Sequence, residues 1–344
     1  MVMENRLGMV CGIGLMALIV TVVTLMIWRQ WAIKVGWVYH PKPDRWQPKF
    51  NPHPRAIALG GGLGIAVGIL PTFLLWALRE GGESCWLRMV PLALSALLLG
   101  LLDDLQDCSA RIKLLVQFVI GLVTALWVTR LAVFPDGISV PLTAFCLVAL
   151  MNAVNMMDNM DGTASGLVTL SALGFSLLGT LTENPSITPV SLLLSASSFG
   201  FWLFNKPPAS IFMGDAGSLF LGYLLGVIAI AASHGRFAYE GAALIVPALM
   251  VGTFAADIIF VVFWRLTHGL PIMKGDRNHL SHRLAVWFGK SEWHANLTLY
   301  GLQALFCAGG LLAAIAPPFM GLIVIVAATL LLSLLFRWLW KVIP

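Results

Sequence analysis

The stretch that decides the fold is LLLGLLDDLQD, Leu97–Asp107, in which a run of leucines ends in three aspartates within five residues. Of the 344 residues, 59% are hydrophobic and 11% are charged, whereas a soluble domain carries about 25% charged residues. The leucine run therefore belongs to a membrane helix, and the aspartates lie at its headgroup boundary. No long polar segment remains for a second domain, so the composition predicts one all-α, membrane-embedded domain over residues 1–344.

Eleven apolar runs are expected to span the membrane. They lie at 9–28, 57–78, 86–102, 114–129, 139–151, 166–181, 189–204, 217–233, 242–264, 297–316 and 319–336. The first run is longer than the apolar part of a signal peptide, and no cleavage pattern follows it. We therefore expect a polytopic protein with a retained first helix.

The basic residues divide unequally between the two sides of this topology. Of the 21 Lys and Arg residues, sixteen lie on one side, and the five on the other are Arg6, Arg79, Arg88, Arg130 and Arg236. Cytoplasmic loops are enriched in basic residues, so the N-terminus is predicted outside and the C-terminus inside. The net charge of +5 then reflects insertion, and a nucleic-acid partner need not be invoked. Nine of ten aspartates share the cytoplasmic side, which suggests a divalent cation with phosphates.

The opening stretch places Asp103 and Asp107 one helical turn apart. Adjacent carboxylates repel each other, and Mg²⁺ relieves that repulsion, although a solvated helix end is the simpler alternative. Arg111 and Lys113 follow at once as phosphate partners. A second motif, NAVNMMDNMDG (152–162), repeats Asn or Asp every three residues and predicts a polar stripe facing either a cavity or another helix.

The third motif is FNKPPASIFMGDAGSLFLGYLLG (204–226). Two prolines break the chain, and GDAGS then opens a helix that Asp215 is expected to cap. The N-terminus of that helix is a natural phosphate site, and capping does not exclude metal binding. Phe212 offers a ring to a nucleobase, or else packs in the core.

The fourth motif, GDRNHLSHRL (275–284), crowds charged and imidazole groups into the longest cytoplasmic loop. Zinc binding by Asp276, His279 and His282 is one interpretation, and recognition of a diphosphate or sugar is the simpler one. The first cytoplasmic loop (40–65) either binds an anion or only anchors the chain by its positive charge.

Four segments, in order and on one predicted side, resemble a known family. They are LLDDLQDCSARIKLLVQF (101–118), NAVNMMDNMDG, FNKPPASIFMGDAGSLFLG (204–222) and DRNHLSHRL (276–284). The family is that of the polyprenyl-phosphate N-acetylhexosamine-1-phosphate transferases, the MraY/WecA superfamily of glycosyltransferase family 4. DRNHLSHRL is similar to the DRxHxHHRL of the WecA-like branch rather than to the triple-histidine version of MraY.

The resemblance implies transfer of N-acetylhexosamine-1-phosphate, first of all GlcNAc-1-phosphate, from a UDP-sugar to undecaprenyl phosphate, with release of UMP. This reaction begins the synthesis of a cell-envelope polysaccharide at the cytoplasmic face of the inner membrane. It implies Mg²⁺, with Mn²⁺ as the alternative ion, and it leaves a homodimer open. Both reactants are anions, so a metal ion and basic residues suit the chemistry because they offset the repulsion.

By position, the resemblance implies metal ligands at Asn155 and Asp215. Asp103 and Asp104 resemble the family's acidic pair, and Lys113 resembles a phosphate-contacting lysine. Asp158 and Asp161, which the resemblance implies as catalytic, match polar positions around the nucleotide, and Phe212 matches the ring that stacks on uracil. His279, His282 and Arg283 resemble the groups that touch the sugar and diphosphate, and the further implied substrate contacts are Asn205, Asp276 and Arg277.

The chain departs from the family pattern at a few positions. Asn159 replaces a glycine of NxxDGxDG, and Ser281 stands where a histidine is usual, which bears on sugar selectivity. The family's PRxGG is stretched to PRAIALGG, so Arg55 receives no role.

Other functions fit parts of the pattern. Phospho-MurNAc-pentapeptide translocase activity is the alternative within the family. An intramembrane prenyltransferase would carry a second DxxxD-like motif, which the sequence lacks. A secondary transporter would place its polar residues near the bilayer midplane between inverted repeats.

Overall fold

The structure is a computed structural model that describes residues 2–39, 56–79, 85–106, 108–184, 186–271 and 276–342. Its elements in chain order are α1 Val2–Val35, β1 Val38–Tyr39, β2 Ile57–Ala58, α2 Gly61–Arg79, the 3-10 helix η1 Cys85–Arg88, α3 Met89–Gln106, α4 Ala110–Trp127, α5 Asp136–Met157, α6 Thr163–Leu181, α7 Ile187–Asn205, α8 Gly214–Ala232, α9 Ala242–Met250, α10 Gly252–Thr267, α11 Leu280–Trp287, α12 Glu292–Ile315 and α13 Pro318–Leu339.

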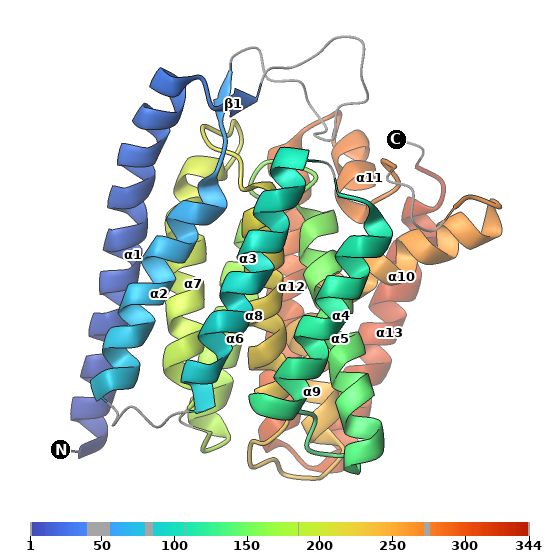
Figure 1. Ribbon diagram of the computed structural model, residues 1–344. Helices are drawn as coiled ribbons and strands as arrows, with labels where there is room; N and C mark the ends of the chain where they lie inside the picture. Colours follow the sequence, from blue (N-terminus) through green and yellow to red (C-terminus); the bar gives the residue numbers. More distant parts are fainter. Residues whose placement is uncertain are drawn as a thin grey trace.

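Ten of the described helices are long and apolar enough to cross a membrane, and the bent pair α9–α10 makes up to eleven. The expectation of a polytopic all-α membrane protein is confirmed. The helices run side by side in one bundle, with the two ends of the chain at opposite ends of it (Figure 1). The ends of α3 and α7, the start of α4, and β1 and α11 gather at the end that also carries the C-terminus.

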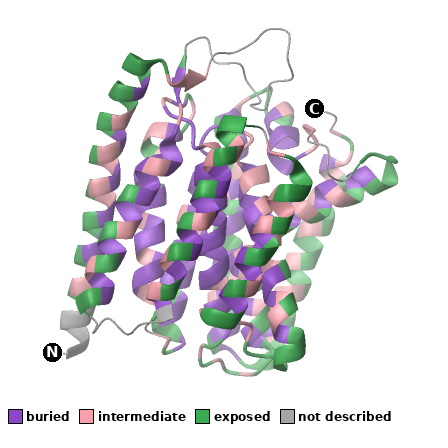
Figure 2. Ribbon diagram, viewed as in Figure 1, coloured by how far each residue is buried: buried purple, intermediate pink, exposed green. Residues whose placement is uncertain are grey.

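Helix α8 occupies the centre of the bundle, and 89% of its apolar window is buried. Figure 2 shows the contrast with α1 and α13, whose outer faces are exposed. Two glycines bring α8 against its neighbours. A Cβ at Gly222 would lie 2.7 Å from the Cα of Met151 on α5, and one at Gly100 of α3 would lie 2.2 Å from the carbonyl oxygen of Asp215. The backbones of α3 and α8 therefore approach more closely there than a side chain at position 100 allows.

A short hairpin covers the end of the bundle where the aspartates lie. Strand β1 pairs antiparallel with β2, and Ala58 of β2 bridges to Ile211 in the segment between α7 and α8. The start of the predicted run 57–78 is therefore strand, and the helix begins at Gly61. Residues 40–55, the larger part of the loop that was predicted to be the first cytoplasmic one, lie outside the described residues, and its predicted anion-binding or anchoring role stays a prediction.

The run 242–264, predicted as one span, is broken between α9 and α10 at an angle of 79°. Backbone groups freed by a break inside a membrane need partners within the protein. Gln303 of α12 supplies a hydrogen-bond donor and an acceptor for these groups. Its amide nitrogen donates to the carbonyl oxygen of Met250 at 2.7 Å, and its amide oxygen accepts from the Thr253 amide at 3.2 Å. Because Gln303 is fully buried, water cannot replace it.

We predict that Gln303→Leu destabilises the protein by about 2–4 kcal/mol, because it leaves two buried backbone groups without their partner. The measurement is thermal unfolding in detergent. Gln106→Leu, at an exposed position of α3, is the control and is expected to change the melting temperature little. Equal melting temperatures for the two variants would contradict this account of the break.

Candidate active site

An acid–base cluster joins three helices at the end of the bundle. The ammonium of Lys113, on α4, lies 2.5 Å from a carboxylate oxygen of Asp103 on α3 and 3.1 Å from one of Asp215 on α8. The other oxygen of Asp103 accepts from the backbone amide of Cys108 at 2.8 Å, in the turn that leads into α4. Two carboxylates from distant parts of the chain, Asp103 and Asp215, thus share one cation, and Lys113 itself lies 102 positions from Asp215. Asp107, the third acid of the opening motif, lies outside the described residues.

Asp104 contacts backbone amides, whereas its neighbour Asp103 contacts the Lys113 side chain. Its two carboxylate oxygens accept from the backbone amides of Asp215 at 2.8 Å and Ala216 at 3.0 Å, at the start of α8. A carboxylate at this position satisfies free amides of the first turn and interacts favourably with the helix dipole. Asp104 therefore caps α8 from another helix.

Two expectations for this helix end are corrected. Asp215 was expected as the N-cap, but Met213 holds that position without a side-chain bond, and Asp215 lies in the first turn. The N-terminus of α8, a candidate phosphate site, carries the Asp104 carboxylate instead. The cause is the close approach of the two helices, together with the positive φ of +73° at Gly214, where a Cβ would meet the Asp104 oxygens at 2.6 Å.

The polar stripe on α5 has two different neighbours. The side chain of Asn155 contacts Asp215, and its amide nitrogen donates to the Ser218 hydroxyl at 2.9 Å. Asn155 thus belongs to the carboxylate cluster. Asn152, one turn earlier, donates to the Gln117 side chain at 2.7 Å, which is the helix–helix contact that was the alternative interpretation.

The turn between α5 and α6 is fastened to the segment before α8. Asp158 ends α5, and its backbone amide donates to the Val154 carbonyl at 3.1 Å. Asp161 is buried, and one of its oxygens accepts from the amide of Ala209 at 2.8 Å. The side chain of Asn205 accepts from the Gly162 amide at 3.0 Å. The sequence marked these polar residues as ligand contacts, and the structure shows several of them holding two loops together.

Phe212 is buried beside the hairpin. It is 4% exposed, and its ring lies edge-on to Tyr39 with centroids 5.5 Å apart. Packing, one of the two alternatives for this ring, is what the structure shows, while stacking on a base stays a prediction.

The fourth motif forms α11 and its approach. Asp257 of α10 accepts from the Leu280 amide at 2.8 Å and contacts the Nδ1 of His279 at 2.7 Å. Asp276 pairs with Arg265 at 3.0 Å. Among the residues that the structure describes, no three His, Cys, Asp or Glu side chains form a metal-binding group. The zinc interpretation of Asp276, His279 and His282 is therefore wrong.

Arg283 is fully buried in α11. Its guanidinium donates to the carbonyl oxygens of Leu339 at 2.9 Å and Val342 at 2.6 Å, near the C-terminus, and lies 3.9 Å from the centre of the Trp264 ring. Burial lowers the pKa of Arg283 to about 10, so it remains charged at neutral pH. In this structure its donors hold the chain end, and its contact with sugar or diphosphate stays a prediction, as does that of Arg277, which precedes α11.

The sequence analysis gave no role to Asp257 or Asn159, although both hold α11. One signal was present: Asp257 is a lone carboxylate within the apolar run 242–264, and an acid at that depth needs a partner. Asn159 was noted only as a departure from the family pattern. Its partner, Ser281, could not be found without the fold.

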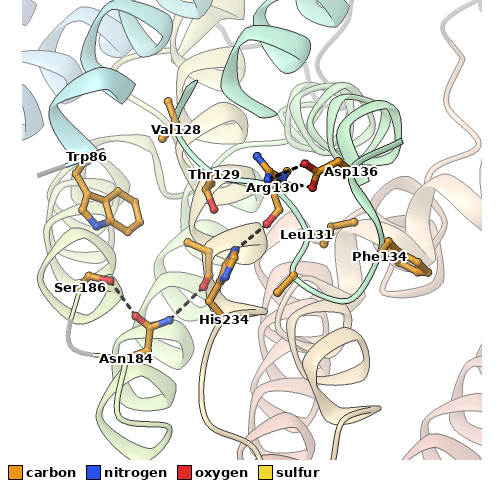
Figure 3. Close-up of a pocket in the computed structure, with 12 residues that line it drawn as sticks. Trp86, Val128, Thr129, Arg130, Leu131, Phe134, Asp136, Asn184, Ser186 and His234 are labelled. Carbon is orange, nitrogen blue, oxygen red and sulfur yellow. Dashed lines mark hydrogen bonds and ion pairs between the residues drawn. The ribbon is translucent and has the colours of Figure 1, made fainter. Parts of the chain in front are cut away.

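Two cavities accompany the helices. An apolar groove of about 410 Å³ runs along α5, α8, α9 and α10, and its lining includes Cys146, Gly226, Pro247 and Val251. A larger, more polar cavity of about 540 Å³ lies at the other end of the bundle, where Arg130, Asp136 and His234 line it (Figure 3). None of the predicted site residues lines either cavity.

Comparisons with known proteins agree with the resemblance. Residues 86–233 match the family described as Glycosyl transferase family 4. A phospho-N-acetylmuramoyl-pentapeptide-transferase of Synechococcus sp. (strain JA-3-3Ab) is 33% identical over 277 residues, covering 73% of this chain and 77% of that protein. A probable undecaprenyl-phosphate N-acetylglucosaminyl 1-phosphate transferase of Bacillus subtilis (strain 168) is 27% identical over 339 residues, covering 94% and 90%. The chain therefore belongs to glycosyl transferase family 4, and the two relatives named above are phosphosugar transferases.

His282 makes the stability of the fold depend on pH. Burial, and then the charge of His279, lower the pKa of His282 from 6.5 to about 4. Between these values the unfolded chain binds the proton and the folded chain does not, so stability falls as the pH falls from 6.5 towards 4.

We predict a loss of about 2 kcal/mol between pH 7.5 and pH 5 from this residue. The measurement is thermal unfolding across that range. His282→Asn is expected to flatten the pH dependence, whatever its effect at pH 7.5, and an unchanged slope would exclude His282 as the cause.

Proposed function

We propose that this chain is a single membrane-embedded transferase domain, residues 1–344, that moves N-acetylhexosamine-1-phosphate, foremost GlcNAc-1-phosphate, from a UDP-sugar to undecaprenyl phosphate. The acceptor phosphate oxygen attacks the β-phosphorus, the bond from that phosphorus to the UMP oxygen breaks, and UMP leaves. The observation that carries the proposal is the Asp103–Lys113–Asp215 cluster at one end of the bundle. The proposed role of the reaction is the first membrane step of a cell-envelope polysaccharide.

Phosphoryl transfer between two anions depends chiefly on positioning and on neutralising charge. Lys113 is half buried and held between two carboxylates, so it offers a fixed cation to an incoming phosphate. Asp104 holds the first turn of α8 in place through backbone amides, and it acts as a positioning residue for Asp215.

The donor set fits a magnesium ion. Mg²⁺ is usually held by one or two carboxylates, with water and substrate phosphate completing six oxygen ligands. Asp215 and Asn155 would hold it, with Asp103 beside them, and the Lys113 ammonium between Asp103 and Asp215 supports a cation at that place. When bound, the ion would neutralise charge on the diphosphate. Asp104 is a weaker candidate because both its oxygens accept backbone hydrogen bonds.

The apolar groove along α5 and α9 supports a polyprenyl acceptor. Its volume of about 410 Å³ is lined almost wholly by aliphatic side chains and glycine, with Phe134 and Leu131 at one end and Ala255 and Ile258 on α10. A lipid tail of this chemistry gains from burying apolar surface there. We further propose that the cluster faces the cytoplasm in the inner membrane, since the basic residues concentrate on that side of the topology.

The phospho-MurNAc-pentapeptide translocase activity is the second candidate, because relatives of that name align with most of this chain. A panel of UDP-sugars separates the two. We predict that purified protein with Mg²⁺, undecaprenyl phosphate and UDP-GlcNAc releases UMP.

Asp215→Asn is expected to lower UMP release by at least a hundredfold while keeping its melting temperature, because it removes a proposed metal ligand. Release from UDP-MurNAc-pentapeptide alone would favour the second candidate. No release from any donor, with active acceptor present, would overturn the enzyme proposal.

We predict that replacing Lys113 changes the affinity for the metal ion. If the ammonium occupies the place that the ion takes, Lys113→Met should bind Mn²⁺ about tenfold or more tightly than the wild type, because a competing charge is gone. Without metal the same variant should melt lower, since two carboxylates then face each other.

The measurement is a Mn²⁺ titration followed by electron paramagnetic resonance, with melting curves in EDTA and in Mg²⁺. Arg111→Met, which removes an exposed cation two residues away, is the matched control and should bind Mn²⁺ as the wild type does. Weaker binding by Lys113→Met would show that the lysine helps to hold the ion rather than competing with it.

A further inference from the structure

Helix α11 has only eight residues, and side chains from two other elements hold its first turn. On one side, Asp257 of α10 binds the Leu280 amide and the His279 ring. On the other, the hydroxyl of Ser281 donates to the side-chain oxygen of Asn159 at 2.8 Å, from the turn between α5 and α6. Ser281 is completely buried, so no water competes for its proton.

The amide of Asn159 is fixed in orientation by a second contact. Its nitrogen donates to the carbonyl oxygen of Met156 at 2.7 Å, in the last turn of α5. The side-chain oxygen must therefore face Ser281, where it can only accept. The backbone oxygen of Asn159 also lies 3.4 Å from the Nε2 of His282. One residue thus joins the end of α5 to two consecutive residues of α11.

Both positions are among the departures from the pattern that the resemblance implies, which has a glycine at 159 and a histidine at 281. Glycine has no side chain to accept the Ser281 proton, so the bond requires the residue found here at both ends. The fold has brought together two substitutions 122 positions apart.

We propose that Asn159 and Ser281 form a positioning pair that fixes α11 against the α5–α6 turn and thereby sets the affinity for the UDP-sugar donor. The inference rests on the proposed function and concerns one part of that site. The segments that the pair joins carry Asp158, Asp161, His279 and His282, all assigned to the donor by the resemblance.

The acceptor and metal groups lie on other elements except Asn155, which is on α5 but whose side chain contacts Asp215 and Ser218. Asp103, Lys113 and Asp215 belong to α3, α4 and α8, and their contacts run among themselves and to Asn155. Loss of the Asn159–Ser281 bond should therefore change the KM for the donor and leave the KM for undecaprenyl phosphate and the affinity for Mn²⁺ as they are.

The test is a double-mutant cycle of Ser281→Ala, Asn159→Ala and the double variant, with UMP release measured against both substrates. Each single variant is expected to raise the donor KM about fivefold, the ratio typical of one buried hydrogen bond. The kcat should change less than the KM, and the double variant should be no worse than the more impaired single variant, because both changes remove the same bond.

The matched control is Ser195→Ala, which removes a buried serine hydroxyl that donates to the Thr169 carbonyl at 3.0 Å between α7 and α6. It should lower the melting temperature as Ser281→Ala does, without a rise in donor KM. A wild-type donor KM in Ser281→Ala, an equal rise in Ser195→Ala, or additive effects in the double variant would each overturn the pair. Absence of UMP release in the wild type would instead overturn the proposed function, and the pair's role with it.

Discussion

The bond from the Asp104 carboxylate to the first amides of α8 is the contact on which the rest of the site depends. It joins the end of α3, just beyond the apolar part of that helix, to α8, which is the most buried membrane helix among the described residues. Because Asp103 precedes Asp104 and Asp215 lies in the capped turn, this bond sets the spacing of the two carboxylates that share Lys113. It forms only because Gly100 and Gly214 leave room for the backbones to meet.

A second set of contacts holds helix α11 in place. Asp257 and Asn159, from two elements, hold the first turn of α11, and Arg283 holds its opposite face to the C-terminal segment. Asp257 and Arg283 are buried and Asn159 is partly buried, and the partners cited here lie 23 or more positions away in the chain. The arrangement brings the four sequence motifs to one end of the bundle, although each motif follows a different helix.

Much of the fold was predictable from the sequence, because apolar length is the strongest constraint that a bilayer imposes. Each of the eleven runs overlaps a helix or the bent pair, although the run 57–78 begins with the strand β2. The sequence analysis did not predict the break at Val251, because Gln303, whose side chain bonds the backbone groups freed there, lies in another helix. The grouping of Asp103 and Asp215 followed from sidedness and from the resemblance. The capping role of Asp104 and the pairing of Asn159 with Ser281 required three-dimensional contacts that spacing along the chain does not contain.

Arg283 donates hydrogen bonds to the carbonyl oxygens of Leu339 and Val342, so the end of α13 and the residues after it help to hold α11. Removing residues 339–342 would strip oxygen partners from a fully buried guanidinium. Loss of activity on such a deletion would therefore be no evidence that the deleted residues touch substrate.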